Sequence, residues 1–167
     1  MKKIVMLAVA SLVLTNTVNA QTGIETRTVG PSAVLEFATG TTKGIILPAV
    51  ETMPSSPANG TFLFDRNDSK IKMRQNNAWV ELSGTGSNST LVAYSGTVDN
   101  AKKTVMGARE SSADGVLVLE SPNKALVLPQ ISNPHLTVKS PYAGMMCYDT
   151  NRKAVAVFDG TLWNYWK

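Results

Sequence analysis

The feature that most constrains the fold of this chain is an internal duplication. Residues 43–50 and 124–131 share a lysine, an aliphatic run and a Leu–Pro pair, at a sequence offset of 81. Other matches lie at offsets of 82 to 84: 34–37 with 116–119, 56–60 with 140–144, 64–65 with 148–149, and Trp79 with Trp163. Because such an ordered set seldom recurs by chance, we interpret the halves as two diverged copies of one structural unit.

The residue pattern of each copy predicts β-strands. Residues 70–74 alternate polar and apolar side chains, which is the period of a half-buried strand. Short apolar strands are expected at 61–64 and 145–148, and turns rich in Asp and Asn follow at 65–68 and 149–152. The last strand of each copy carries its tryptophan. The sequence therefore predicts an all-β fold made of two tandem antiparallel meanders.

Further signals concern turns and strand ends. Residues 159–160, Asp-Gly, predict a two-residue hairpin turn, and residues 76–77, Asn-Asn, are its weaker counterpart. Apolar strands are expected at 45–50 and 126–131. The proline in each favours a strand end or a sheet edge, because proline has no N–H to donate. Residues 91–95 could add a strand, and no segment shows a helical period over ten residues.

The N-terminus predicts a secretory signal peptide. Lys2 and Lys3 precede an apolar run at 4–14, and small residues at the predicted cleavage site place the cut after Ala20. The run is shorter than the roughly twenty residues of a membrane-spanning helix. The alternative, a buried or amphipathic helix, would show a polar face. Gln21 rather than cysteine follows the cut, so we expect a protein of the periplasm, cell surface or extracellular space without a lipid anchor.

Removal of this peptide changes what the composition implies. The formal net charge of +4 falls to +2, because Lys2 and Lys3 leave with the peptide. The remaining cations are scattered, so we expect no nucleic-acid partner. No later apolar stretch suggests a membrane span. The single cysteine, Cys147, provides no internal disulfide, and units of about sixty residues are marginal alone. We therefore expect the copies to pack on each other or the chain to form homo-oligomers.

The predicted organisation has four parts. Residues 1–20 are the signal peptide, residues 21–84 and 104–167 are the two β units, and residues 85–103 are a linker. Residues 83–90 are rich in serine, glycine and threonine, which predicts a flexible connection.

Few residues suggest chemistry. His135 is the only histidine, and no sequence signal pairs it with a nucleophile and an orienting acid. Cys147 aligns with Leu63 in an apolar strand, which favours a small buried side chain over a reactive thiol. Residues 65–68 could suggest calcium, but they lack the glycine and distal glutamate of a calcium loop, so a turn is the favoured interpretation. We expect no catalytic residue, no cofactor and no metal.

The aromatic residues of the last strand are the candidate contact residues. Alternation predicts Trp163 and Tyr165 on one face and Trp166 on the other. Trp163, repeated as Trp79, also fits a core anchor. Tyr165 and Trp166 have no aromatic counterpart in the first copy, so they are candidates for a subunit interface or, as the alternative, for stacking against a sugar.

The same segments resemble a repeat of exported Bacteroidetes proteins. Residues 33–37 are similar to its A-x-L-x-(L/V) strand, and residues 41–48 to its T-T-K-G-(I/L)-L-L-P-R stretch. Residues 141–163 resemble its final segment, which contains G-(M/L), a Tyr–Asp pair, Asp-Gly and a tryptophan. Similar segments look like phage tail-fibre and adhesin modules. The resemblance implies a β-rich surface protein, compatible with a trimer, and it transfers no catalytic residue.

These observations favour a secreted or surface-exposed, non-enzymatic structural or interaction protein of fibre-like or adhesin-like type. We expect it to form a homo-oligomer, with a cell-surface protein or a glycan as a further partner. A carbohydrate-binding module is the alternative, and a secreted hydrolase is the third reading. An assembly interface would bury the aromatic surface between chains, whereas glycan binding would leave it open.

Overall fold

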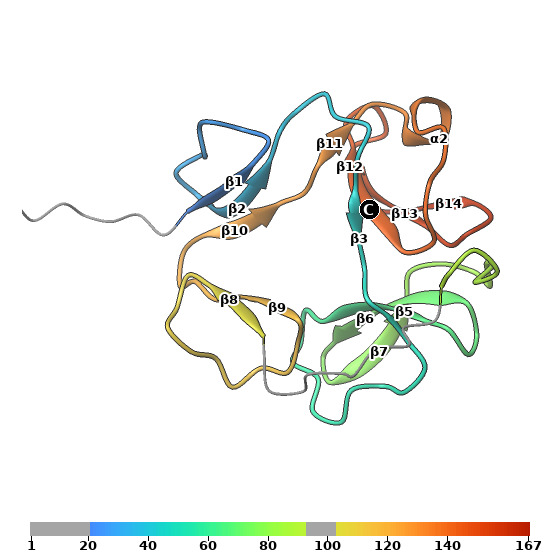
Figure 1. Ribbon diagram of the computed structural model, residues 1–167, viewed down its shortest axis with the longest axis horizontal. Helices are drawn as coiled ribbons and strands as arrows, with labels where there is room; N and C mark the ends of the chain where they lie inside the picture. Colours follow the sequence, from blue (N-terminus) through green and yellow to red (C-terminus); the bar gives the residue numbers. More distant parts are fainter. Residues whose placement is uncertain (1–20, 93–102) are drawn as a thin grey trace, which may run out of the picture.

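The computed structural model describes residues 21–92 and 103–167 and is built almost entirely of β-strands (Figure 1). Small sheets lie around the centre of the molecule, and the described residues contain one short helix, α2 (Pro134–Thr137). The all-β prediction is confirmed. The predicted signal peptide, residues 1–20, and residues 93–102 of the predicted linker lie outside the described residues.

Each copy contains the predicted antiparallel meander. The strands of the first are β5 (Phe62–Asp65), β6 (Lys70–Gln75) and β7 (Ala78–Glu81). Those of the second are β12 (Met145–Asp149), β13 (Ala154–Phe158) and β14 (Trp163–Trp166).

A short parallel strand extends each meander at its first edge. It is β4 (Ala49–Val50) beside β5 and β11 (Gln130–Ile131) beside β12. The registers are equivalent, since Ala49 pairs with Phe64 as Gln130 pairs with Tyr148. The duplication seen in the sequence is therefore a duplication of strand pairing.

Each predicted apolar segment has a strand end at its proline, as the sequence predicts, and the chain then continues in a different sheet. Before Pro48 the chain forms β3 (Ile45–Ile46), and before Pro129 it forms β10 (Ala125–Val127). Because proline cannot donate to a ladder, the pairing stops there and the chain changes sheets. β3 pairs with β12 while β4 pairs with β5, and β10 pairs with β2 (Ala33–Phe37) while β11 pairs with β12.

The duplication extends to the beginning of each copy. There β1 (Thr22–Ile24) runs parallel to β2, and β8 (Thr104–Met106) runs parallel to β9 (Leu117–Leu119). Thr22 pairs with Leu35 as Thr104 pairs with Leu117, at an offset of 82 on both strands. The sequence match at β1 and β8 is too short to be noticed without this register.

The two copies interlock. β3 of the first copy pairs antiparallel with β12 of the second, and β10 of the second pairs parallel with β2 of the first. The main hydrophobic core lies between the inner faces of the meanders, with Phe64 and Ile71 from one and Met146 and Val157 from the other. This is the mutual packing that the small size of each copy leads us to expect.

The described part of the predicted linker is held against both copies. The Gly86 N–H donates to the Ser69 carbonyl at 2.9 Å, and the Ser87 N–H donates to the Asp159 carbonyl at 2.8 Å. Leu91 is buried in the main core and lies in no strand. Composition predicts flexibility here, but the small residues let this backbone lie close to two other backbone segments, whose carbonyls it satisfies. The boundaries of the linker stay a prediction.

Of the two predicted final hairpin turns, the one at 76–77 has the expected length and the one at 159–160 does not. Asn76 and Asn77 form the two-residue turn, with φ of 51° and 59°, as a type I′ turn requires. Residues 159–162 form a four-residue connection instead of the expected two-residue turn. The Asp159 carboxylate accepts the N–H groups of Thr161 and Leu162 at 2.8 and 2.7 Å, which stabilises the wider loop.

Candidate functional site

The candidate contact residues lie on both faces of β14. Trp163 pairs with Phe158 and Tyr165 with Ala156, so both point to the outer face of the second meander, whereas Trp166 pairs with Val155 on the inner face. The predicted alternation is confirmed.

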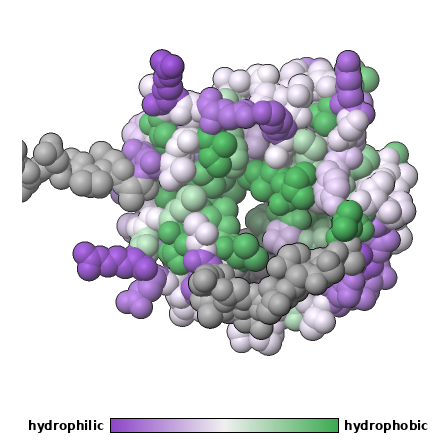
Figure 2. Space-filling view, viewed as in Figure 1, coloured by the Kyte–Doolittle hydropathy of each residue, from purple (hydrophilic) through white to green (hydrophobic). Residues whose placement is uncertain are grey.

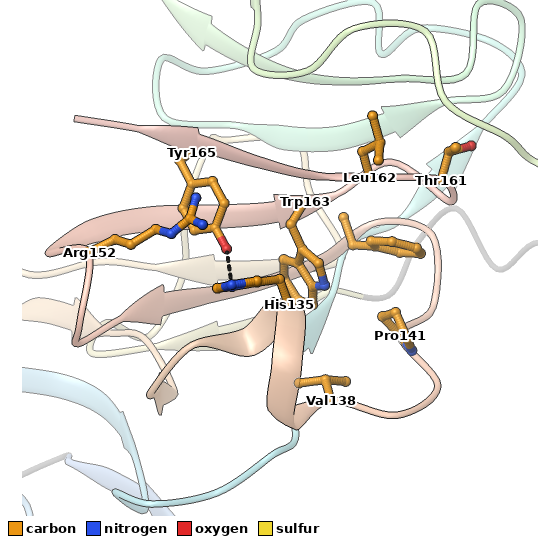
Figure 3. Close-up of a pocket in the computed structure, with 9 residues that line it drawn as sticks. His135, Val138, Pro141, Arg152, Thr161, Leu162, Trp163 and Tyr165 are labelled. Atoms are coloured by element: carbon orange, nitrogen blue, oxygen red, sulfur yellow. Dashed lines mark hydrogen bonds between the residues drawn. The ribbon is translucent and has the colours of Figure 1, made fainter.

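On the outer face, Trp163 and Tyr165 border an open groove with a cavity volume of about 430 Å³ (Figure 3). His135 of α2 also lines the groove, as do Leu162 and Thr161 of the β13–β14 loop. The groove thus depends on the helix and on the wide loop, which the sequence does not predict.

Tyr165 is the best-connected side chain of the groove. Its hydroxyl lies 3.1 Å from His135 Nδ1, and the Arg152 guanidinium lies 4.1 Å from the centre of its ring. The Arg152 Nε lies 4.0 Å from the buried Asp149 carboxylate. Burial raises the pKa of the Tyr165 phenol, although the charge of Arg152 acts in the opposite direction. The phenol therefore acts at neutral pH as a protonated hydrogen-bonding group.

Trp163 packs against the sheet rather than standing free. Its ring lies 5.4 Å from that of Phe158, and its side chain contacts the small core cluster of Ile131, Cys147 and Ala156. One face of Tyr165 is covered by Arg152 (Figure 3). A sugar that stacked on that face would have to displace Arg152. Glycan binding stays a prediction.

The equivalent outer face of the first meander has a different character. Lys72 lies 2.7 Å from Asp65 and 2.6 Å from Asp68, and Lys70 lies 2.8 Å from Glu81. At the equivalent positions the second meander has Ala156, Asp149, Arg152, Ala154 and Tyr165. The same sheet face therefore carries ion pairs in one copy and an aromatic groove in the other.

On the inner face, three apolar residues of the second meander form a partly open row that we call the open strip: Tyr148, Val155 and Trp166. They lie side by side across β12, β13 and β14. Their counterparts Phe64, Ile71 and Leu82 are all buried in the main core. Trp166 is 42% exposed, whereas Leu82 is 7% exposed. A surface that is core in one copy is thus still accessible in the other.

The surroundings of the other residues considered for chemistry favour a structural role for each of them. Cys147 is fully buried, and burial with a further effect of Asp149 raises the pKa of its thiol to about 12. Asp65 accepts the Asn67 N–H at 3.0 Å and so closes a turn. His135 contacts a phenol rather than a serine or cysteine. Within residues 21–92 and 103–167 no cluster of three His, Cys, Asp or Glu side chains could hold a metal ion.

Sequence reasoning finds the aromatic residues of the groove but misses His135, Arg152 and α2. These residues lie on separate segments, and only the fold brings them beside Tyr165. No helix in the described part of the chain is long and apolar enough to cross a membrane.

A comparison with known families matches the chain to the phage tail like trimerisation region, at residues 23–97 and 105–167. No curated protein and no solved structure matches the chain.

Proposed function

Because this chain belongs to the phage tail like trimerisation region family, we propose that it is a non-enzymatic structural protein that assembles with copies of itself into a trimer. The observation that carries the proposal is the open strip. Tyr148, Val155 and Trp166 form a partly exposed apolar row, with Trp166 the most open, on a face whose counterpart is core. An apolar row of this kind is stabilised when another chain covers it.

The test is the mass of the protein in solution. Residues 21–167 should give the mass of a trimer by light scattering, and Trp166→Ala should move the equilibrium toward folded monomers. Leu162→Ala is the matched control, because Leu162 is also an exposed apolar residue of the second copy but lies in the β13–β14 loop. A wild-type protein that stayed monomeric at high concentration would overturn the proposal.

The proposal extends to the compartment. The order of charged, apolar and small residues at 1–20 supports export, with a mature N-terminus at Gln21. Mass spectrometry of the protein from its native host tests this directly. A chain that retained residues 1–20 would contradict it.

We further propose a fibre-like or adhesin-like role at the cell surface or outside the cell. The divergence of the two outer faces supports this, since the aromatic groove offers a recognition surface that the first copy lacks. A glycan array tests the carbohydrate alternative, with Tyr165→Ala as the comparison. Glycan binding that Tyr165→Ala abolished would favour the alternative, and a surface-protein partner is favoured if no glycan binds.

A further inference from the structure

We propose that the pairing which joins the two halves of one chain is repeated between chains. A second chain of the same protein adds its β3 to the open edge of β9 of the first chain. The same second chain adds its β5 to the open edge of β10. This inference rests on the proposed self-assembly and specifies which strands form the contact.

The first part follows from the two N-terminal sheets. β1 and β2 correspond to β8 and β9 with identical register, but β2 has a third strand, β10, on its other edge. Among the described residues, no strand pairs with that edge of β9. The effect on burial is large: Leu35 of β2 is 1% exposed and its counterpart Leu117 of β9 is 46% exposed.

The missing third strand has a defined identity. β10 is the second-copy counterpart of β3, so the strand that fits β9 is a β3. In the chain, Leu126 pairs with Leu35 and Val127 with Glu36. Applying the same offsets places Ile45 of a second chain beside Leu117, and Ile46 of that chain beside Val118. Ile46 is itself exposed, so this pairing would cover apolar surface on both chains.

The second part follows from the edge of the meander. In the second copy, β11 covers the C-terminal half of β12 and β3 covers its N-terminal half. In the first copy, β4 covers the C-terminal half of β5, and no strand of the described residues pairs beside Phe62 on that edge. The counterpart of the β3–β12 pair is a pair of β10 with β5 of a second chain. This pair places Phe62 of the second chain beside Leu126.

The two pairings belong to one interface. Among the described residues, β3 pairs with β12 alone and β10 pairs with β2 alone, so each has one open edge. Figure 1 places β3, β9 and β10 around the centre of the molecule, where Figure 2 shows hydrophobic residues around a hollow. By the same offsets, Tyr148 of the open strip of one chain would meet the partly exposed Phe62 of the next, as Phe64 meets Met146 in the core.

This interface is head-to-tail, since β9 and β10 of one chain meet β3 and β5 of another. A head-to-tail contact either closes into a ring or continues as a filament. The family to which the chain belongs favours closure by three copies. Addition of a strand to an open sheet edge is a known mode of recognition, in which main-chain hydrogen bonds give affinity and alternate side chains give register.

Disulfide trapping tests the register. In a Cys147→Ala background, chains carrying Ile45→Cys should cross-link to chains carrying Leu117→Cys when the two are mixed and oxidised, because paired strands lie within disulfide distance. Neither variant alone should cross-link, because the interface is head-to-tail. The double variant should give covalent trimers on a non-reducing gel. Ile45→Cys with Leu119→Cys is the off-register control and should cross-link far less.

The edge can also be blocked without altering the fold. Leu117→Lys adds a charge to the open edge and should raise the concentration of half-dissociation about tenfold or more. Leu136→Lys, at an exposed apolar residue of α2, should leave it unchanged.

The outcomes separate the two proposals. A trimer by light scattering that gives no in-register cross-link, or that Leu117→Lys leaves intact, overturns this inference and leaves the proposed function standing. A monomeric wild-type protein overturns both.

Discussion

Individual positions in the two copies differ in how much the fold constrains them. Asp65 and Asp149 are equivalent, both are buried, and each accepts the N–H of the residue two positions later, at 3.0 and 2.9 Å. The turn needs this carboxylate, which explains its presence in both copies without a calcium ion. By contrast, Cys147 stands where the first copy has Leu63, so this position requires only a small or medium apolar side chain.

The Cys147 thiol gives a pH-dependent prediction. Burial, with a further effect of Asp149, raises the pKa of the thiol from 9.0 to about 12 in the folded protein. The folded state therefore favours the protonated thiol, and this contribution to stability is fully present below about pH 9 and is lost as the pH rises toward 12. We expect the free energy of unfolding of the wild type to fall about 1 kcal/mol more than that of Cys147→Ala between about pH 8 and pH 10.

Urea denaturation at a series of pH values measures this difference. Other groups that titrate in this range are common to both proteins, so their effects cancel in the comparison. Parallel stability curves for the two proteins would show that the thiol is not buried in solution.

At the scale of secondary-structure elements, the connection between the copies is a structural part of the fold. Residues 83–91 donate hydrogen bonds to both meanders and place Leu91 in the main core. Gly86 lies where its backbone passes Asp159 closely. A Cβ at Gly86 would collide with the Asp159 carbonyl and with its Cβ.

This contact predicts that alanine substitution is destabilising at Gly86 and nearly neutral at Gly84. Gly86→Ala should lower the free energy of unfolding by about 2 kcal/mol or more, because the obstructing atoms belong to backbone. Gly84→Ala is the matched control, since a Cβ there meets nothing within 4 Å, and its effect should be within about 0.5 kcal/mol. Thermal or urea denaturation measures both. Equal stabilities would mean that this segment is loose in solution.

The elements also show where sequence reasoning succeeds and where it stops. Alternation at 70–74 and the match between 64–65 and 148–149 predict the meanders, because both patterns depend on neighbours within one hairpin. Strand ends at Pro48 and Pro129 are predicted, but the change of sheet that follows them is missed, because it depends on partners far away in the sequence. The Asp159 turn is missed for a local reason, since its side chain stabilises a longer loop than the Asp-Gly pair predicts.

The residues of the groove divide in the same way, into those that the local sequence predicts and those that depend on distant partners. Trp163 and Tyr165 can be assigned to one face from their spacing alone. His135 and Arg152 reach Tyr165 only through the docking of α2 and of the β12–β13 turn. Their sequence neighbours carry no signal of that contact.

At the scale of the whole molecule, the two copies form one cooperative structure. The main core takes buried side chains from both copies, and two inter-copy strand pairs join them. Neither copy could retain this core if the other unfolded. The whole chain is therefore expected to unfold in one step, in spite of its tandem sequence.

Calorimetry of the wild type and two core variants tests this expectation. Phe64→Ala, in the first copy, and Met146→Ala, in the second, should each shift a single transition to lower temperature, with losses of about 2–5 kcal/mol. The calorimetric and van't Hoff enthalpies should agree. Two transitions, each moved by only one of the variants, would contradict the shared core.

The divergence of the outer faces has a consequence for how binding could evolve in such an assembly. The inner faces hold the copies together, whereas Glu81 and Tyr165 occupy equivalent outward positions with unrelated chemistry. A mutation at such a position changes what is displayed without changing what holds the molecule together. Each outer face is present once on every chain of the assembly. A contact that is too weak to be effective on one chain therefore gains avidity when several chains make it together. Natural selection could therefore act on very faint initial affinities, one outer face at a time.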